Sequence, residues 1–386
     1  MKKRNDFLIF ILMIGVFGII NTEMGLIGIL PVIAQLFNVS VATAGLLISC
    51  FALGVAISGP TLPLLFSNVD RKKAMLLALS IFCLSNVVSI FTHDFTILLL
   101  ARIVPAFFQP VYVSMAFTLA SQTAEPARKQ QTVAKIFIGV SAGMVLGVPL
   151  TSFIANNFSY RLAMAFFALV NGVVLLLTLF FIPSLPVQKK VGYKSQLSVL
   201  KTPLMLSSII AVVGANAAVF GFYSYLSEFL SSVSHLSSNI VSMLLLVYGI
   251  ANIIGNIIAG NTLSVAPKKT IAIVLIIAFF SYFGLFLAGQ SSFVTLSLIL
   301  VIGIVAGLIA NINQYLINAA APDASDLANG VFLTATNLGT TIGTMICGSL
   351  LSLFGTSFTL LGTLGSIIFS AIVLSVRQKF LLEYDR

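Results

Sequence analysis

Apolar residues fill long runs along this chain, and short polar or Gly/Pro-rich breaks separate the runs. A helix needs about 20 mostly apolar residues to cross the hydrocarbon layer of a bilayer. The runs reach that length, so the pattern predicts an all-α membrane protein. Cutting the chain at the breaks predicts twelve membrane-spanning helices, at residues 7–35, 42–66, 73–91, 96–121, 132–156, 160–182, 204–230, 240–263, 270–289, 293–319, 328–353 and 356–376.

One break is much longer than the others. It covers residues 183–203, PSLPVQKKVGYKSQLSVLKTP, and separates six predicted spans from six. We therefore expect an N-terminal six-helix bundle over residues 1–182, a cytoplasmic loop over 183–203 and a C-terminal six-helix bundle over 204–386.

The amino-terminal run allows a second interpretation. It reads MKKRNDFLIFILMIGVFGIINTEM, and a basic start followed by apolar residues is also typical of a secretory signal peptide. The run continues past Met24 without a convincing small-residue cleavage site, so we assign it to the first span.

Composition excludes a soluble domain. Hydrophobic residues make up 59% of the 386 residues, charged residues only 8%, and the mean hydropathy is +1.12. A soluble chain carries about 25% charged residues, so this chain lacks the polar surface that water contact requires.

The net charge of +10 suggests either an anionic partner such as nucleic acid or a topology signal. Lys and Arg concentrate in the cytoplasmic loops of membrane proteins. Arg161 falls in an outer loop and Arg102 within a span. With the amino terminus inside, the other 18 of the 20 basic residues fall on the cytoplasmic side: Lys2, Lys3, Arg4, Arg71, Lys72, Lys73, Arg128, Lys129, Lys135, Lys189, Lys190, Lys194, Lys201, Lys268, Lys269, Arg377, Lys379 and Arg386. We therefore expect both termini in the cytoplasm and no nucleic-acid partner.

The two halves of the chain repeat. A shift of 196–197 residues places PLLFSNVDRKK, from Pro63, on GNTLSVAPKKT, from Gly260. The same shift places Gly143 on Gly339 and Gly147 on Gly343. A parallel six-plus-six repeat is the architecture of major facilitator transporters, which bind their substrate near mid-membrane between the halves.

Four stretches carry a closer resemblance, in order and on matching spans. They are NTEMGLIGILPVIAQLFNVSVATAGLLISCFALG, PLLFSNVDRKKAM, LLARIVPAFFQPVYV and GVSAGMVLGVPLTSFIANNFSYRLAMAF. The chain resembles the twelve-span drug:proton antiporter branch of the major facilitator superfamily, and within it the sugar-efflux and purine-efflux permeases. The resemblance implies export of a drug or a polar metabolite, such as a sugar or a nucleoside or purine, driven by proton entry through alternating access.

The loop between the second and third spans departs from the family motif. The family usually has glycine first and aspartate fifth, where this chain has Pro63 and Ser67. Asp70 stands later, beside Arg71, and could take the place of the missing aspartate. We assign a gating role to Asp70 and Arg71.

The stretch GVSAGMVLG allows two interpretations. Gly139, Gly143 and Gly147 recur every four residues, line one helix face and permit close helix packing, and Pro149 is expected to kink or loosen the helix beyond them. Following the family motif, we expect this face to seal the two halves against leakage.

The same stretch also fits the G-x-S-x-G motif of a serine hydrolase, with Ser141 as nucleophile. That motif needs a strand, a turn and a histidine base. The histidines, His93 and His235, both fall in predicted outer loops. An intramembrane hydrolase is therefore the least favoured alternative.

Two charged residues lie deep within predicted spans. Glu23 is about 11 residues, or roughly 16 Å, from the outer end of the first span, and Arg102 is about 7 residues, or roughly 10 Å, below the outer end of the fourth. A buried carboxylate must be paired, protonated or facing water. We assign proton coupling to Glu23 and Arg102. Structural hydrogen bonding is the alternative for both residues, and Glu228 is a minor candidate for a second proton site.

Amides, hydroxyls and tyrosines recur within several spans, and in lipid they need polar partners. They either join neighbouring helices or line a cavity for a neutral polar solute such as a sugar, nucleoside or nucleobase. Asn311 and Gln314 share one helix face. We assign substrate binding to nine residues: Asn21, Thr22, Tyr112, Tyr223, Tyr248, Asn252, Asn311, Gln314 and Asn337.

The sequence contains no nucleotide-phosphate loop, metal-ligand cluster or catalytic triad. Cys50, Cys83 and Cys347 lie in apolar runs as small core residues. We expect a monomeric inner-membrane transporter, not an enzyme, without a cofactor or metal, whose partners are a small molecule, protons and the bilayer. A sensor on the same fold, proton symport and uniport remain alternatives.

Overall fold

In the computed structural model the described residues are 2–66, 69–123, 129–184, 202–321 and 325–384. Most of the predicted loop 183–203 therefore lies outside the described residues, as does Ser67. The helices are α1 (Lys2–Met24), η1 (Gly25–Ile29), α2 (Leu30–Phe37), α3 (Val41–Ala44), α4 (Leu46–Ser58), α5 (Leu62–Leu65), α6 (Arg71–Phe91), α7 (Phe95–Thr123), α8 (Lys129–Asn157), α9 (Tyr160–Phe181), α10 (Pro203–Tyr223), α11 (Leu226–Ser232), α12 (Ser238–Val265), α13 (Pro267–Ala288), α14 (Ser292–Ala320), α15 (Ser325–Phe354), η5 (Thr356–Phe358) and α16 (Thr359–Tyr384).

Within the described part of the chain, twelve helical stretches are long and apolar enough to cross a membrane, which confirms the predicted number. The second predicted span, 42–66, was too long at its carboxyl end. The stretch ends at Ser58, because Gly59 and Pro60 interrupt the helix before the separate turn α5.

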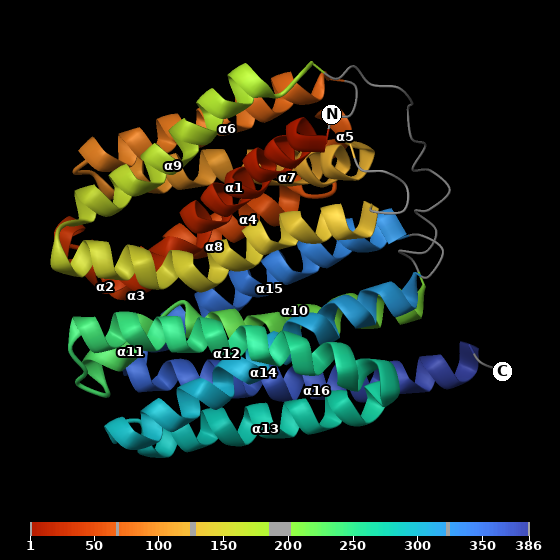
Figure 1. The fold of residues 1–386 in the computed structure, drawn as a ribbon. Coiled ribbons are helices and arrows are strands. Elements are labelled where there is room, and N and C mark those ends of the chain that lie inside the picture. Colours follow the sequence, from red (N-terminus) through yellow and green to blue (C-terminus); the bar gives the residue numbers. More distant parts are fainter. Residues whose placement is uncertain (1, 67–68, 124–128, 185–201, 322–324, 385–386) are drawn as a thin grey trace.

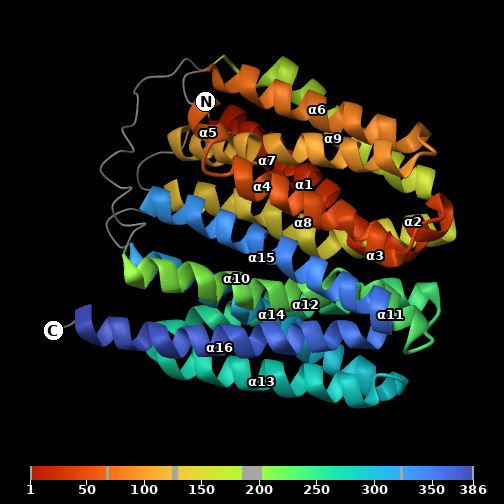
Figure 2. The same cartoon turned by 180° about the vertical axis from the view of Figure 1, so that it is seen from behind.

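The helices form two side-by-side groups, an N-terminal half from α1 to α9 and a C-terminal half from α10 to α16 (Figure 1; seen from behind in Figure 2). Within the halves, α1 packs on α8 and α6 on α9, while α10 packs on α15 and α16 and α12 on α14. The main contacts between the halves pair α4 with α15 and α8 with α12.

The first span of each half is interrupted at a similar distance from its start. α1 gives way to η1 at Gly25, in the segment GLIGILP, where two glycines and a proline disfavour a regular helix. α10 ends at Tyr223, and α11 begins at Leu226. These two joints lie at the end of the molecule opposite the chain termini (Figure 1).

The glycine face of α8 packs on α1 of the same half, which corrects our expectation that it seals the two halves. A Cβ added at Gly143 would lie 2.8 Å from the Cβ of Ile20, and one added at Gly147 would overlap the Asn21 side chain. Gly139 lies in the same way against the backbone of Met13. The three glycines therefore face inward because only glycine lets α1 and α8 approach so closely.

Other residues of α8 contact the opposite half. An added Cβ at Gly249 of α12 would lie 2.9 Å from the Val145 side chain, so these two helices also approach closely. Pro149 lies inside α8, which continues without a break to Asn157. The proline therefore does not end the helix.

The predicted repeat also relates the helix contacts. Gly143 faces the carbonyl oxygen of Phe17, and Gly339 faces the carbonyl oxygen of Val213. The two glycines are 196 residues apart in the sequence, and so are Phe17 and Val213. The α1–α8 and α10–α15 pairs are therefore equivalent packing units.

Candidate functional site

The Glu23 carboxylate is held by a glutamine of α7. Glu23 lies in the last turn of α1 and is half-buried, and Gln109 Nε2 donates a hydrogen bond to its Oε2 atom at 2.6 Å. Gln109 is only 6% exposed, and its Oε1 atom has no hydrogen-bond partner. The sequence analysis missed Gln109, although it follows Arg102 by seven residues and therefore shares its helix face.

Arg102 is 1% exposed and does not form an ion pair with Glu23. Its Nη1 atom donates to the backbone oxygen of Thr22 at 3.2 Å and to Asn86 Oδ1 at 3.5 Å. Nη2 donates to Met164 Sδ at 3.1 Å. Arg102 therefore joins α1, α6, α7 and α9, as the structural interpretation of this residue expected, and it touches the backbone beside Glu23.

The guanidinium of Arg102 also lies 5.5 Å from the ring centroid of Phe167. A cation at this distance from an aromatic face is stabilised by the ring. The buried positive charge is thus held by a carbonyl, an amide, a thioether and a ring.

Asn21 and Thr22 lie inside the N-terminal half. Asn21 is 0% exposed, packs against Gly147, and neither polar atom of its side chain has a partner. The Thr22 hydroxyl donates to a carbonyl of its own helix and accepts from Asn86 and Asn171. Their assigned substrate role is not supported by this placement, because the two side chains face neighbouring helices of their own half.

Tyr112 is likewise enclosed within the N-terminal half. Its hydroxyl fills the space above Gly15 of α1, next to Val174 of α9. A glycine at that position leaves room for the tyrosine, so the structure places Tyr112 among the packing residues and away from the other candidates.

The structure brings two predicted residues of the C-terminal half together through a third. Asn311 Nδ2 of α14 donates to Asn256 Oδ1 of α12 at 2.6 Å, and Asn256 Nδ2 donates to Asn252 Oδ1 at 3.1 Å. All three side chains are half-buried. Glycines at the crossing permit this approach, since a Cβ added at Gly303 would lie 2.7 Å from the backbone oxygen of Tyr248. We call Asn252, Asn256 and Asn311 the amide ladder.

A pair of stacked tyrosines adjoins the amide ladder along α12. The rings of Tyr223 and Tyr248 are 4.5 Å apart between centroids and inclined by 16°. Tyr248 lies one turn before Asn252 on α12. The aromatic surface and the ladder therefore belong to one region.

Gln314 and Asn337 are both half-buried. Gln314 follows Asn311 by three residues on α14, so it continues the same helix face. Asn337 of α15 donates to the Leu333 oxygen of its own helix at 2.9 Å. Amides that are only half-buried retain hydrogen-bonding capacity for a solute.

The predicted gating residues lie at the start of α6. Asp70 caps this helix by accepting from the Lys73 backbone N–H at 3.1 Å, and its other oxygen accepts from the Ser184 hydroxyl at 2.5 Å. Arg71 is the first residue of α6. These contacts of Asp70 remain within the N-terminal half.

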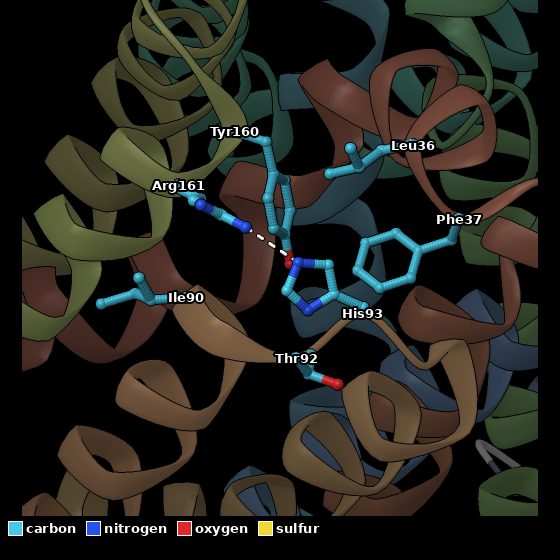
Figure 3. Close-up of a pocket in the computed structure, with 7 residues that line it drawn as sticks. All are labelled: Leu36, Phe37, Ile90, Thr92, His93, Tyr160 and Arg161. Carbon is cyan, nitrogen blue, oxygen red and sulfur yellow. Dashed lines mark hydrogen bonds between the residues drawn. The ribbon is translucent and has the colours of Figure 1, made fainter.

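The arrangement gives no support to a hydrolase. Ser141 lies exposed within the continuous helix α8, not at a strand–turn–helix junction. His93 lies between α6 and α7, where its Nε2 atom is 2.8 Å from Arg161 Nη2, beside a small cavity that Phe37 and Tyr160 also line (Figure 3). Among the described residues no group of histidine, cysteine and acidic side chains is arranged to hold a metal.

Four hydrogen bonds between described residues join the halves. Ser227 donates to the Ile27 oxygen at 2.9 Å, and Thr341 donates to the Ser49 oxygen at 3.2 Å. Two more join α8 to the start of α12, between Ser152 and Ser242 at 2.8 Å and from Asn157 to Asn239 at 3.0 Å. All four lie in the part of the molecule away from the chain termini, which we call the joined end.

Comparison with known proteins gives relatives along nearly the whole chain. The inner membrane transport protein YdhP of Escherichia coli is 28% identical over 359 residues, covering 92% of this chain and 92% of that protein. A protein of Helicobacter acinonychis named "Probable sugar efflux transporter" is 30% identical over 342 residues, covering 88% of this chain and 86% of that protein.

Solved structures share the fold. The nucleoside transporter NupG superposes with a TM-score of 0.80 at 15% identity, covering 97% of this chain and 99% of that chain. A bacterial homolog of the human lysosomal transporter Spinster gives 0.78 at 15% identity, covering 98% and 97%. The family model described as Major Facilitator Superfamily matches residues 12–344 and also 235–381. The chain therefore belongs to the major facilitator superfamily of secondary transporters and is not an enzyme.

Proposed function

We propose that this chain exports a small neutral polar solute, such as a sugar, in exchange for protons. The observation that carries the proposal is the half-buried Glu23 carboxylate in the first span. Its Oε2 atom accepts a hydrogen bond at 2.6 Å from Gln109 Nε2 of α7. The relative named as a sugar efflux transporter supports the choice of solute class. In this proposal the chain resides in the inner membrane with both termini in the cytoplasm.

In that orientation the joined end faces outward. A carboxyl that takes up a proton from outside and releases it inside links the direction of solute movement to the proton gradient. Glu23 is placed for this role because it is accessible in part, and Gln109 holds its carboxylate in one position through a hydrogen bond. Arg102 holds the helix backbone beside Glu23 in place.

The amide ladder and the tyrosine pair are proposed to recognise the solute. Amide groups both donate and accept hydrogen bonds, as a hydroxylated solute requires. Tyr223 and Tyr248 are buried and stacked on each other beside the ladder, and we expect them to provide an apolar contact for a sugar or base. Because the ladder carries no charge, we expect it to select against ionic solutes.

Inverted membrane vesicles that are acid inside test this proposal. Sugars, nucleosides, nucleobases and lipophilic cations are added one at a time while a pH-sensitive dye reports proton release. We expect one neutral polar class to release protons in the unmodified protein and in Glu228→Gln, but not in Glu23→Gln. Glu228 is the matched control because it is a half-buried carboxylate in α11, outside the twelve spans.

Other outcomes identify the alternatives. An equal response in Glu23→Gln would show that proton coupling does not use Glu23. Movement of a labelled solute without proton release would indicate uniport, and proton movement with the solute would indicate symport. If no solute moves under any gradient, the chain is a sensor on a transporter fold.

A further inference from the structure

The small cavity beside His93 lies within the N-terminal half, at the end of the molecule away from the chain termini (Figure 3). Its volume is about 50 Å³, and its walls come from α2, from the end of α6 with the residues that follow it, and from the start of α9. The cavity has room for roughly three or four water molecules. It is too small for a whole organic solute, which needs about 300 Å³ or more, but it can take one polar group of a larger molecule.

A cationic side chain lines this cavity. Arg161 of α9 is exposed, and its Nη2 atom lies 2.8 Å from Nε2 of His93. A guanidinium only donates hydrogen bonds, so the His93 ring accepts this bond through Nε2. Within the described part of the chain, the other N–H groups of Arg161 have no hydrogen-bond acceptor.

The positive charge of Arg161 has no acidic partner in the cavity. None of the lining residues carries a carboxylate, and no ion pair between described residues involves Arg161. Asp94, which follows His93 in the sequence, is turned to the start of α7, where its Oδ1 atom accepts from the backbone N–H of Thr96 at 2.6 Å. The site is therefore complementary to an anion.

The wall beside Arg161 is held by contacts inside the protein. Tyr160 is 5% exposed, and its hydroxyl donates to the Ser89 oxygen at 3.2 Å. The ring of Tyr160 packs edge-on against Phe37, with the ring centroids 5.7 Å apart. These contacts join α9 to α6 and to α2, so the cavity is preformed and Arg161 supplies the donors for an incoming anion.

The site lies at the level where lipid headgroups meet the hydrocarbon layer. The third span ends at Phe91, two residues before His93, and the sixth begins at Tyr160, one residue before Arg161. Three large apolar side chains that line the cavity or adjoin a lining residue in the sequence are exposed: Leu36, Phe91 and Leu162. A ligand at this site therefore meets a cation and an apolar surface together, as the headgroup and acyl chains of a lipid require.

We infer that Arg161 binds the phosphate group of a phospholipid at the mouth of this cavity, with the acyl chains against the exposed apolar side chains. Arginine suits phosphate because its planar N–H groups donate two parallel hydrogen bonds. His93 is the positioning residue, since its acceptor nitrogen holds the guanidinium at the cavity. The inference goes beyond the proposed export function and does not depend on it. All the walls belong to one half, so the lipid stays bound in both orientations of the transporter.

Tryptophan fluorescence tests the site, because the chain contains no tryptophan. Phe158, three residues before Arg161 and 67% exposed, is changed to tryptophan (Phe158→Trp) as a single reporter. The purified protein, in a detergent without phosphate, is titrated with phosphatidylglycerol whose acyl chains carry bromine, which quenches the fluorescence. Diacylglycerol with the same chains lacks the phosphate, and glycerol phosphate lacks the chains. We expect diacylglycerol to need about tenfold more for half-quenching and glycerol phosphate not to compete.

Variants on the same background identify the residues. Arg161→Gln should raise the half-quenching concentration of phosphatidylglycerol about tenfold, as the loss of a hydrogen bond to a charged group implies. Arg161→Lys keeps the charge without the paired N–H groups and should raise it less. His93→Leu should raise it about threefold, and His93→Gln, which retains an acceptor, should restore most of the binding. Lys268→Gln is the matched control, because Lys268 is an exposed cation at the start of α13, and it should change nothing.

Three results would overturn the inference. Equal half-quenching concentrations with and without Arg161→Gln would show that this arginine does not bind the lipid. Equal quenching by diacylglycerol would show an apolar contact alone, and full competition by glycerol phosphate would show a site for a free anion. The apparent Tm of each variant confirms folding, and Arg161→Lys carries the test if Arg161→Gln is unstable. None of these results bears on the export proposal, which solute movement tests separately.

Discussion

The two halves have equivalent packing but carry different polar groups at mid-membrane. The N-terminal half contains Glu23, bound by Gln109, and the buried Arg102. The C-terminal half contains instead the amide ladder and the stacked tyrosines. Glycines allow close helix contacts in both halves, so the difference lies in the chemistry and not in the packing.

Each half also contains one buried arginine, and the two arginines have different surroundings. Arg102 bonds to a backbone oxygen of α1, and Arg377 of α16 bonds to Ser208 at 2.7 Å and to the Leu316 oxygen at 3.3 Å. Arg102 lies toward the joined end, whereas Arg377 lies near the carboxyl end of the chain. Each guanidinium joins helices, but only Arg102 is adjacent to a residue proposed to exchange protons.

This comparison suggests a division of labour. Burying a charged side chain in a membrane costs free energy, so such residues are expected where the charge has a function. Uncharged amides suffice for hydrogen bonding to a solute. The N-terminal half is therefore expected to govern coupling, and the C-terminal half affinity.

The largest effect is expected for Arg102→Met. The substitution removes hydrogen bonds to Thr22, Asn86 and Met164 and leaves polar groups of three helices without this donor. We expect a loss of about 3 kcal/mol in stability, measured as a lower apparent Tm in detergent. Arg377→Met is the matched control and should cost less, and an equal loss would remove the distinction between the two arginines.

Gln109→Leu should affect coupling more than stability. Glu23 loses its hydrogen bond, and a hydrogen bond to a charged group contributes about 1.5–3 kcal/mol. We expect proton-driven uptake in inverted vesicles to fall roughly tenfold or more. Gln314→Leu, on the other half, should change solute affinity while leaving the number of protons per solute intact, and an uncoupled Gln314→Leu would contradict the division of labour.

Asn256→Leu should weaken solute binding without uncoupling. It removes the middle of the ladder, so Asn311 and Asn252 each lose a side-chain hydrogen bond, and Asn311 keeps only its bond to the Gly307 oxygen. We expect the half-saturating solute concentration to rise about fivefold, as the loss of about 1 kcal/mol implies. Asn313→Leu is the control, because Asn313 is 0% exposed with both polar atoms unpaired, so its loss should leave affinity unchanged and stability equal or higher.

The smallest effect concerns pH and Asp94, outside the spans. Hydrogen bonds from the backbone N–H groups of Ile97 and Thr96 lower the pKa of the Asp94 carboxyl. A lowered folded-state pKa means that the stabilisation is present at neutral pH and is lost as the pH falls through that pKa. Asp94→Asn should therefore slightly lower the apparent Tm at pH 7 and make it less sensitive to acid, and an unchanged acid profile would refute this role.

Hydropathy was sufficient to predict the number of spans, because each run reaches about the length that the hydrocarbon thickness requires. It did not determine the rotation of each helix about its axis. Asn21 and Thr22 were assigned to the same role as Asn311, yet both are buried inside the N-terminal half, where Asn171 bonds to the Thr22 hydroxyl and Asn21 packs against Gly147. Gln109 was missed because the position of an amide within an apolar run does not indicate which carboxylate it will bond to in the folded protein.

The clasp at the joined end consists of four hydrogen bonds between uncharged groups. At about 0.5–1.5 kcal/mol each, they contribute roughly 2–6 kcal/mol in total. Moving one elementary charge through 100 mV releases about 2.3 kcal/mol. The membrane voltage acting on a single proton is thus comparable to the clasp, so the balance between the two orientations of the transporter should respond to membrane potential and hardly at all to ionic strength.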